Sequence, residues 1–259
     1  IVGDNGTVLK STDGGSSWVE KPSVLTTDLY SIYRDKNDIL WSGGNLNKLQ
    51  CSSDFGETWY QKPDVSDEGT DILYINKISC KGNTVYASGS QLFLSGNEGA
   101  IWYWFPVCRD CIYFDSDTTS NNIYFVGSNS GYDKDVAYIY PFTEMLKTGN
   151  YFYSIDLLND NTGIITGDKG NLLIKKNEIW GNVLSGNALN IDVIHFFNDE
   201  IGWLATGYQT IGSYFSNIYI TEDAGESWRY ITILPCYNKV DFICFTNETL
   251  GFLGSNGVI

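Results

Sequence analysis

The sequence predicts an all-β fold, a propeller of four-stranded antiparallel blades. Two observations carry this prediction: an eight-residue box that recurs along the chain, and a glycine-terminated phrase that recurs in phase with it. The composition agrees, because 27 Gly, 18 Tyr and 8 Trp among 259 residues suit strands and tight turns better than helices. We expect little helix, since no stretch keeps apolar residues at the spacing of one helix face.

The box has the form Ser/Thr-x-Asp-x-Gly-x-x-Trp, with Asn in place of Asp in one of its four copies. A hydroxyl and a carboxylate two residues apart can hydrogen-bond the backbone of their own turn. The Gly supplies a positive φ, and the Trp three residues later is placed to pack. We therefore expect a structural strand–turn–strand unit. Its defining residues are Ser11, Asp13, Gly15 and Trp18; Ser52, Asp54, Gly56 and Trp59; Ser95, Asn97, Gly99 and Trp102; and Thr221, Asp223, Gly225 and Trp228.

The boxes mark a period of about 42 residues. Asp13 and Asp54 are 41 residues apart, and Asp54 and Asn97 are 43 apart. Two steps later, Lys175–Trp180 stands where a further box is due. Repeats of this length with four short strands are typical of propeller blades.

Each period is expected to run from a first strand through a hairpin to a box turn and an outer strand. The first strands are the apolar runs 29–33, 72–78, 112–114, 151–157, 191–197 and 240–245. The glycine-terminated phrase supplies the hairpin, clearly at Ile1–Val8, Ile165–Leu172 and Phe252–Ile259 and more loosely at 39–44, 85–89, 124–127 and 202–207. The outer strands are 18–21, 59–62, 101–105, 179–184 and 228–233. The repeat at 110–149 lacks a box, and we expect a turn of helix near 142–147.

The repeat arithmetic gives a single propeller domain over residues 1–259. The phrase at Phe252–Ile259 aligns with the phrase at Ile1–Val8, an offset of 251 residues or six periods. The chain therefore holds six repeats and a partial one. It continues past a closing first strand into a second and a third strand, so we expect seven blades when complete, with six as the alternative. Without an initiator Met, the chain is expected to be a trimmed piece.

The charge balance disfavours two classes of partner. The chain has 31 acidic and 16 basic residues and a net charge of −15. Nucleic acid and anionic lipid both need Lys and Arg for neutralisation, so we expect neither as a partner. No apolar run approaches the ~18 residues of a membrane span, and no membrane insertion is expected.

The cysteines bear on the compartment and on metal binding. Six are present, which permits three disulfides, and two sequons begin at Asn5 and Asn247. We expect a secreted protein or one of an organelle lumen on this basis. Cys108 and Cys111 form a lone C-x-x-C, and no second pair or histidine pair completes a zinc site. No metal and no cofactor are expected.

The boxes resemble the Asp-box, also called the bacterial neuraminidase repeat. The flanking phrases at 202–207 and 3–15 are closer to the photosystem II stability/assembly factor-like propellers, which are seven-bladed in that family. The resemblance covers nearly the whole chain and implies the propeller fold. Asp-box propellers include sialidases, xyloglucan-active glycosidases, sortilin-type receptors and non-enzymatic assembly factors, so the fold does not fix the function. The resemblance to the assembly factors also implies a basic, arginine-containing surface that engages the partner, which a chain with three Arg and a net charge of −15 does not obviously reproduce.

The requirements of an enzyme are poorly met. A sialidase-like site holds a substrate carboxylate with three arginines, and this chain has only Arg34, Arg109 and Arg229, in positions not expected to converge. Two-carboxylate glycoside hydrolysis needs an acidic pair roughly 5–10 Å apart. Acidic loop residues available for it are Asp64, Asp67, Glu68, Asp71, Asp110, Asp133, Asp135 and Asp168. His195, the only histidine, is expected in the core or channel wall.

We therefore expect a non-catalytic scaffold that binds a protein, peptide or glycan through its top-face loops. Tyr and Arg are common interface anchors. The candidate contacts are Asp67, Glu68, Arg109, Tyr132, Asp133, Asp135, Tyr208 and Tyr237. The alternative is a secreted glycoside hydrolase, sialidase-like or xyloglucanase-like, that uses carboxylates of that face. A convergent carboxylate pair would favour the enzyme, and a face without one would favour the scaffold.

Overall fold

The computed structural model describes most of the chain. The described residues are 1–67, 70–71, 73–105, 111–119, 122–129, 136–140, 145–146, 151–177, 179–184, 189–211, 213–236, 239–247 and 250–254. The chain divides into two compact units. Unit 1 is Ile1–Thr118 with Asn129–Tyr132, and unit 2 is Thr119–Ser128 with Asp133–Ile259.

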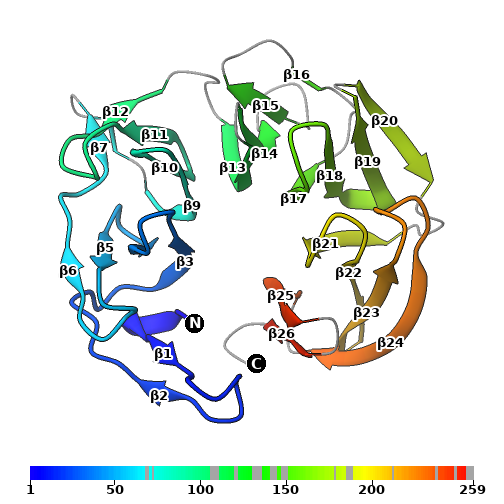
Figure 1. Ribbon diagram of the computed structural model, residues 1–259, viewed down its shortest axis with the longest axis horizontal. Helices are drawn as coiled ribbons and strands as arrows, with labels where there is room; N and C mark the ends of the chain where they lie inside the picture. The colour runs from blue at the N-terminus through cyan, green and yellow to red at the C-terminus, as the bar shows by residue number, and fades with distance from the viewer. Residues whose placement is uncertain are drawn as a thin grey trace. The chain divides into compact units, whose positions relative to one another are not determined.

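Unit 1 contains two complete four-stranded antiparallel blades, whose strands pair in sequence order (Figure 1). The first consists of β3 (Leu29–Arg34), β4 (Leu40–Gly44), β5 (Leu49–Ser52) and β6 (Tyr60–Gln61), and the second of β9 (Ile75–Lys81), β10 (Thr84–Gly89), β11 (Leu92–Ser95) and β12 (Tyr103–Trp104). The unit also holds the 3₁₀ turn η1 (Asp4–Gly6), the paired strands β1 (Leu9–Lys10) and β2 (Val19–Glu20), the hairpin β7 (Ser66–Asp67) and β8 (Thr70–Asp71), and β13 (Cys111–Thr118).

Unit 2 also contains two complete blades of this kind. They are β17 (Phe152–Leu157), β18 (Thr162–Gly167), β19 (Asn171–Lys176) and β20 (Ile179–Leu184), with the turn η2 (Asp168–Gly170), and β21 (Asn190–Phe196), β22 (Gly202–Thr210), β23 (Ser213–Thr221) and β24 (Arg229–Cys236). Before them lie β14 (Ile123–Asn129), β15 (Val136–Tyr140) and β16 (Met145–Leu146), and after them the pair β25 (Phe242–Asn247) and β26 (Leu250–Gly254).

The strands follow the order that the repeats predict, with one correction. The turn of helix expected near 142–147 is wrong at Met145–Leu146, which form β16 and pair with Tyr138 and Ala137 of β15. The backbone groups on the second side of β15 need hydrogen-bond partners, and a strand supplies them where a helix could not. The chain thus keeps a fourth-strand position in a repeat that has no box.

Buried clusters join neighbouring blades within each unit. In unit 1, Trp41 of β4, Ile75 of β9 and Phe93 of β11 belong to one cluster. In unit 2, Ile164 of β18 and Leu204 of β22 belong to another. Burial of such apolar surface is the main stabilising term of a sheet that packs face to face with its neighbour.

Two further observations concern membranes and thiols. Within the part of the chain that the structure describes, no helix is long and apolar enough to cross a membrane. Cys51, Cys80, Cys236 and Cys244 are free thiols. Burial raises the pKa of Cys80 to about 12, so this thiol is unreactive at neutral pH. Of the predicted C-x-x-C pair, Cys108 lies outside the described residues.

Candidate functional site

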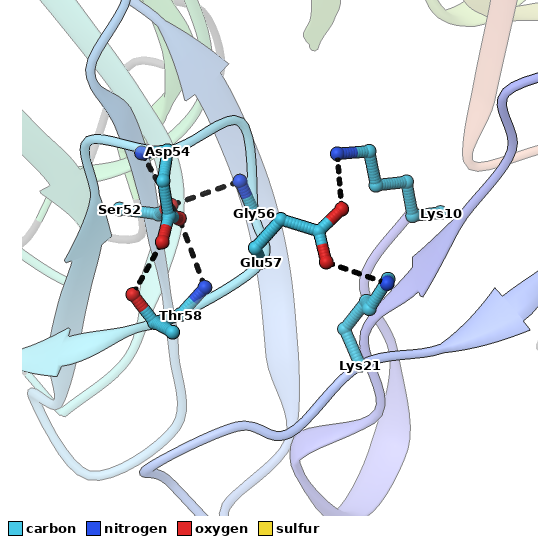
Figure 2. A network of polar contacts seen from close by, with 7 residues as sticks. All are labelled: Lys10, Lys21, Ser52, Asp54, Gly56, Glu57 and Thr58. Carbon is cyan, nitrogen blue, oxygen red and sulfur yellow. Dashed lines mark hydrogen bonds and ion pairs between the residues drawn. The ribbon is translucent and has the colours of Figure 1, made fainter.

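Each box closes its own turn with the hydrogen bonds that its residue types allow (Figure 2). Ser52 Oγ accepts a bond from Gly56 N at 2.8 Å and donates one to Asp54 Oδ1 at 2.8 Å. The Asp54 carboxylate also accepts bonds from the backbone N–H and the hydroxyl of Thr58. These bonds, with the Thr58 hydroxyl first, lower the pKa of Asp54 to about 2. A carboxylate bound in this way is a poor proton donor and a poor ligand for anything outside its turn.

The boxes also fasten each turn to the preceding blade. Glu57 accepts ion pairs from Lys10 at 2.7 Å and Lys21 at 2.6 Å, both beside the β1–β2 sheet (Figure 2). In unit 2, Lys176 at the end of β19 pairs with Glu226 of the next box at 2.6 Å. The box tryptophans pack backwards in the same way.

Trp59 lies in a buried cluster with Val8 and Leu25, which precede its own sheet in the sequence. Trp102 lies in a cluster with Trp41 and Leu49 of the blade before it. Trp228 packs against the cluster that contains Ile164 and Leu172 of the blade before it. The box side of a blade, which carries this turn, is therefore occupied by contacts between blades.

One turn in unit 2 does without the box. The predicted copy at Lys175–Trp180 is instead a shorter turn, in which Lys176 of β19 pairs directly with Ile179 of β20. Lys175 is 1% exposed, and its Nζ donates to the Tyr124 hydroxyl at 2.8 Å and to the Asp160 carbonyl at 2.7 Å. Trp180 still packs on the cluster that contains Tyr124. A buried lysine replaces the hydroxyl and carboxylate, and the tryptophan contact is kept.

The opposite side of each blade, where its first strand begins, carries a recurring β-bulge. We call it the bulge side. Leu29 pairs with Gly44 and Ser31 with Gly43, which leaves Tyr30 as an extra residue. The other three complete blades have the same register shift between their first and second strands. The extra residues there are Asn76, Tyr153 and Asp192. Bulges re-aim a side chain and are common beside functional sites.

In three of the four complete blades a glycine pairs with the residue before the bulge, and it explains the glycine at the end of the predicted phrase. A Cβ on Gly44 would lie 2.0 Å from the Asp28 carbonyl oxygen, and one on Gly89 2.0 Å from that of Tyr74. A Cβ on Gly167 would lie 1.9 Å from the Tyr151 carbonyl oxygen. In these three blades the missing side chain admits the backbone of the first strand.

The fourth blade departs from this pattern, because Thr206 pairs with Ile191 before the bulge and Gly207 lies one residue further, opposite Asn190. A Cβ on Gly207 would lie 2.3 Å from the Tyr214 hydroxyl and 2.4 Å from Asp192 Oδ2. A phenol and a carboxyl therefore share the space beside Gly207. Asp192, Tyr214 and Gly207 come from three strands of one blade, β21, β23 and β22.

Asp192 is electrostatically unusual. Burial raises the pKa of Asp192 to about 6, with Asp241 adding to the rise and Lys239 and the Tyr214 hydroxyl opposing it. Its Oδ2 is buried and has no hydrogen-bond partner of acceptable geometry among the described residues, although Tyr214 is near enough to affect the pKa. Burial, followed by the charge of Asp192, raises the pKa of Tyr214 to about 12. The pKa of Tyr153, at the preceding bulge, is raised by burial and then by Asp168 and Asp192.

Asp168 is held by its own turn and is not part of this pair. Its Oδ1 accepts the Tyr151 N–H at 2.8 Å. The turn η2 repeats η1, since Lys169 has φ 54° and ψ 32° where Asn5 has φ 53° and ψ 32°. Both turns donate a backbone N–H to the side chain before the next first strand, from Asn5 to Asp28 and from Lys169 to Asn190. This carboxylate, available on sequence grounds, has a structural task.

The blade that carries Asp192 extends beyond Gly207. Its β22 and β23 have nine residues each, where β18 and β19 of the neighbouring blade have six. Tyr208 and Phe215 stack on this extension at 5.5 Å between ring centroids, and Ile211 at its tip is fully exposed. We call residues 207–211 and 213–216 the arm. Its base is the Asp192–Tyr214 pair.

The only histidine lies near an acid, with different geometry. His195 Nδ1 is 3.5 Å from Asp156 Oδ2, and the same oxygen accepts the Phe196 N–H at 2.6 Å. Asp156 therefore joins β17 to β21 through the backbone. Among the described residues no group of three His, Cys, Asp or Glu could hold a metal ion.

The predicted contact residues are only partly placed. Tyr208 lies on the arm in unit 2, and Asp67 ends β7 in unit 1. The others lie outside the described residues: Glu68, Arg109, Tyr132, Asp133, Asp135 and Tyr237. The sequence reasoning missed Asp192, Tyr153 and Tyr214. The available signal was an acid between Ile191 and Val193, inside an apolar strand.

Comparisons with known proteins address the fold. No family model and no curated protein matches the chain. The propeller in "YCF48 bound to D1 peptide" matches with a TM-score of 0.70 at 17% identity, over 97% of this chain and 83% of that chain. YCF48 from Cyanidioschyzon merolae matches with a TM-score of 0.66 at 18% identity, over 99% of this chain and 88% of that chain. The GH74 enzyme of Niastella koreensis matches with a TM-score of 0.65 at 16% identity, over 86% of this chain and 42% of its own. The predicted β-propeller fold is confirmed, and at these identities the likeness concerns the fold alone.

Proposed function

We propose that this chain is a non-catalytic scaffold that binds a protein or peptide partner on the bulge side of unit 2. The observation that carries the proposal is the Asp192 carboxyl, whose buried Oδ2 lacks a partner of good geometry beside Tyr214 and Gly207. Buried polar atoms in folded proteins are nearly always hydrogen-bonded, and the exceptions gather at functional sites. A ligand group that bonds this oxygen would remove the exception.

The arm is a second reason to place the contact surface on the bulge side. Aromatic side chains are enriched among the anchors of interfaces, and Tyr208 and Phe215 of the arm are half-buried. Tyr208 and Phe215 stiffen each other by stacking, and Ile211 exposes its whole side chain at the tip. That YCF48 was solved with a D1 peptide bound shows that a propeller of this fold can hold a peptide.

A matched pair of isoleucines tests the proposal. The purified chain is used to select peptides from a random dodecapeptide display library, and the affinities of the selected peptides are then measured. Ile211→Ala on the arm should weaken binding by about tenfold, the loss of one buried interface side chain. Ile179→Ala, at the start of the outer strand β20 and also exposed, should leave it unchanged. Selection of no peptide, or equal effects of the two variants, would contradict the proposal.

A second function, glycoside hydrolysis, is favoured by one observation. A carboxyl with a pKa of about 6 can keep its proton near neutral pH, as a general acid must, and Asp241 is near enough to influence it. Release of reducing sugar from xyloglucan or from a sialylated glycan would test this. Activity that is lost in both Asp192→Asn and Asp241→Asn would replace the scaffold with an enzyme.

A further inference from the structure

We propose that Asp192, Tyr214 and Tyr153 together form the anchor site for a basic side chain, lysine or arginine, of the bound peptide. The inference rests on the proposed binding function and adds the chemistry of the partner. It starts from the four bulge positions, which hold Tyr30, Asn76, Tyr153 and Asp192. Asp192 is the one among them that can carry a full charge at neutral pH.

The geometry around Asp192 fits a cation better than a neutral group. The Asp192 carboxyl and the Tyr214 hydroxyl both lie in the space that a Cβ on Gly207 would take. An ammonium or guanidinium group would donate to Oδ2 through a charge-assisted hydrogen bond, roughly twice as strong as a neutral one. Such a bond would satisfy an oxygen that lacks a partner of good geometry among the described residues.

Two tyrosines accompany the carboxyl. Tyr214 of β23 and Tyr153 of β17 both lie within electrostatic range of Asp192. Aromatic rings next to a carboxylate are a recurrent environment for ammonium and guanidinium groups, because the ring faces carry partial negative charge. The combination of one carboxylate with phenols separates this site from a plain acidic cluster.

The charge of the whole chain acts in the same direction. With a net charge of −15, the chain attracts basic segments and repels acidic ones over the range of a Debye length. Near Asp192, Asp241 adds negative charge and Lys239 removes part of it. A basic peptide would therefore arrive faster and be held at the position where the carboxyl is least solvated.

The experiment uses the peptides selected from the random dodecapeptide library. Selected peptides should be enriched in Lys and Arg about fivefold or more over the unselected library, and acidic peptides should be depleted. Asp192→Asn should lower their affinity by about tenfold or more, since a charge-assisted bond is lost. Asp199→Asn, an exposed acid in the turn between β21 and β22, is the matched control and should have no effect. Asp192→Asn is nearly isosteric, and thermal unfolding checks that it folds.

A pH series supplies a second readout. Affinity should fall as the pH decreases from 8 to 5, because the free carboxyl of Asp192 takes up its proton near pH 6. The titratable groups around Asp192 are the same in the parent and in Asp192→Asn. They are Tyr153, Tyr214, Cys236, Lys239 and Asp241, with Asp168 next to Tyr153. The fall should be absent in Asp192→Asn.

The outcomes separate the two proposals. If peptides are selected without enrichment in Lys and Arg, or if Asp192→Asn binds them as the parent does, the anchor site is wrong and the binding function stands. If no peptide is selected at all, the binding function itself is wrong. A pH profile that is equal in the parent and in Asp192→Asn would also overturn the anchor site.

Discussion

Asp223 and Asp192 belong to the same blade of unit 2 and have opposite environments. Asp223, in the box, accepts bonds from the Ser227 N–H at 2.9 Å, the Ser227 hydroxyl at 2.6 Å and the Thr221 hydroxyl at 2.7 Å. Asp192, on the bulge side, has a buried oxygen without a good partner among the described residues. The recurring motif thus contains the saturated carboxylate. The carboxylate with unused bonding capacity lies in a strand that shows no motif.

The boxless turn at Lys175 sharpens this comparison. There the box hydroxyl and carboxylate are replaced by a lysine bound to Tyr124 and Asp160, yet the packing of Trp180 remains. The tryptophan contact with the preceding sheet is the part of the box that both turns share. The polar residues of the box serve turn closure, which can be achieved in more than one way.

The largest expected effect lies on the box side. Trp102 is 3% exposed between two blades of unit 1, so Trp102→Ala should lower the free energy of unfolding by about 4 kcal/mol. Trp104, two residues on and 37% exposed, is the control, and Trp104→Ala should cost about 1 kcal/mol. Urea unfolding measures both. Equal losses would mean that the box tryptophan is not what joins the blades.

The next effect compares two glycines of unit 2. Gly167→Ala places a Cβ 1.9 Å from a backbone carbonyl oxygen, and the strand must move, at about 3 kcal/mol of stability. Gly207→Ala meets the ends of two side chains, which can rotate away, and should cost about 1 kcal/mol. Gly207→Ala should also reduce peptide affinity, since it displaces Asp192 and Tyr214. Unchanged affinity in Gly207→Ala would contradict the placement of the site.

A smaller effect on stability depends on pH. It has one sign for Asp192 on the bulge side and the opposite sign for the carboxylates of the boxes. The pKa of Asp192 is raised from 3.8 to about 6, so its ionisation penalises the folded state above pH 6 and not below pH 4. Asp192→Asn should therefore raise the free energy of unfolding by about 2 kcal/mol at pH 7.5 and leave it unchanged at pH 4.

The pKa values of Asp13 and Asp54, held by the Ser17 and Thr58 hydroxyls, are lowered to about 2. Their stabilising contribution is present above pH 4 and is lost as the pH falls towards 2. Asp54→Asn should thus destabilise at pH 7.5 and have little effect at pH 2. Thermal unfolding across this range checks both carboxylates. If Asp54→Asn stabilised the protein at pH 7.5, the expected difference in sign between Asp54 and Asp192 would be wrong.

The smallest effect concerns the ion pairs between blades. Glu57 is about half exposed, so Glu57→Gln should lower the free energy of unfolding only slightly at low salt. Salt of 1 M should abolish the difference, because the Debye length then falls to about 3 Å and the attraction between exposed charges is screened. Glu226→Gln, which loses one ion pair instead of two, should have the smaller effect.

Much of the fold could be predicted because its signals are local. Ser52, Asp54 and Gly56 define a turn within a few residues, and the periodic glycines mark strand ends that the structure explains through Gly44 and Gly167. The site could not be predicted in the same way. A bulge is a property of pairing between two strands, so the sequence does not mark Asp192 as the extra residue.

Contacts between residues far apart in the sequence could not be predicted either. Tyr214 is separated from Asp192 by more than 20 positions, and only the register of β21, β22 and β23 brings the two together over Gly207. The prediction of a box at Lys175–Trp180 failed for a related reason. Lys175 finds Tyr124 on an earlier strand, a contact at 51 residues' separation that no local pattern could indicate.

The backward packing of the tryptophans has a consequence for synthesis on the ribosome. Trp102 completes the cluster around Trp41, which lies about 60 residues earlier in the chain. That cluster stays open to water until the next repeat has been translated and has left the exit tunnel. Each repeat is thus finished by its successor, and the growing chain always has one unfinished sheet at its leading end. Chaperones that bind apolar surface would find it there, one repeat behind the point of elongation.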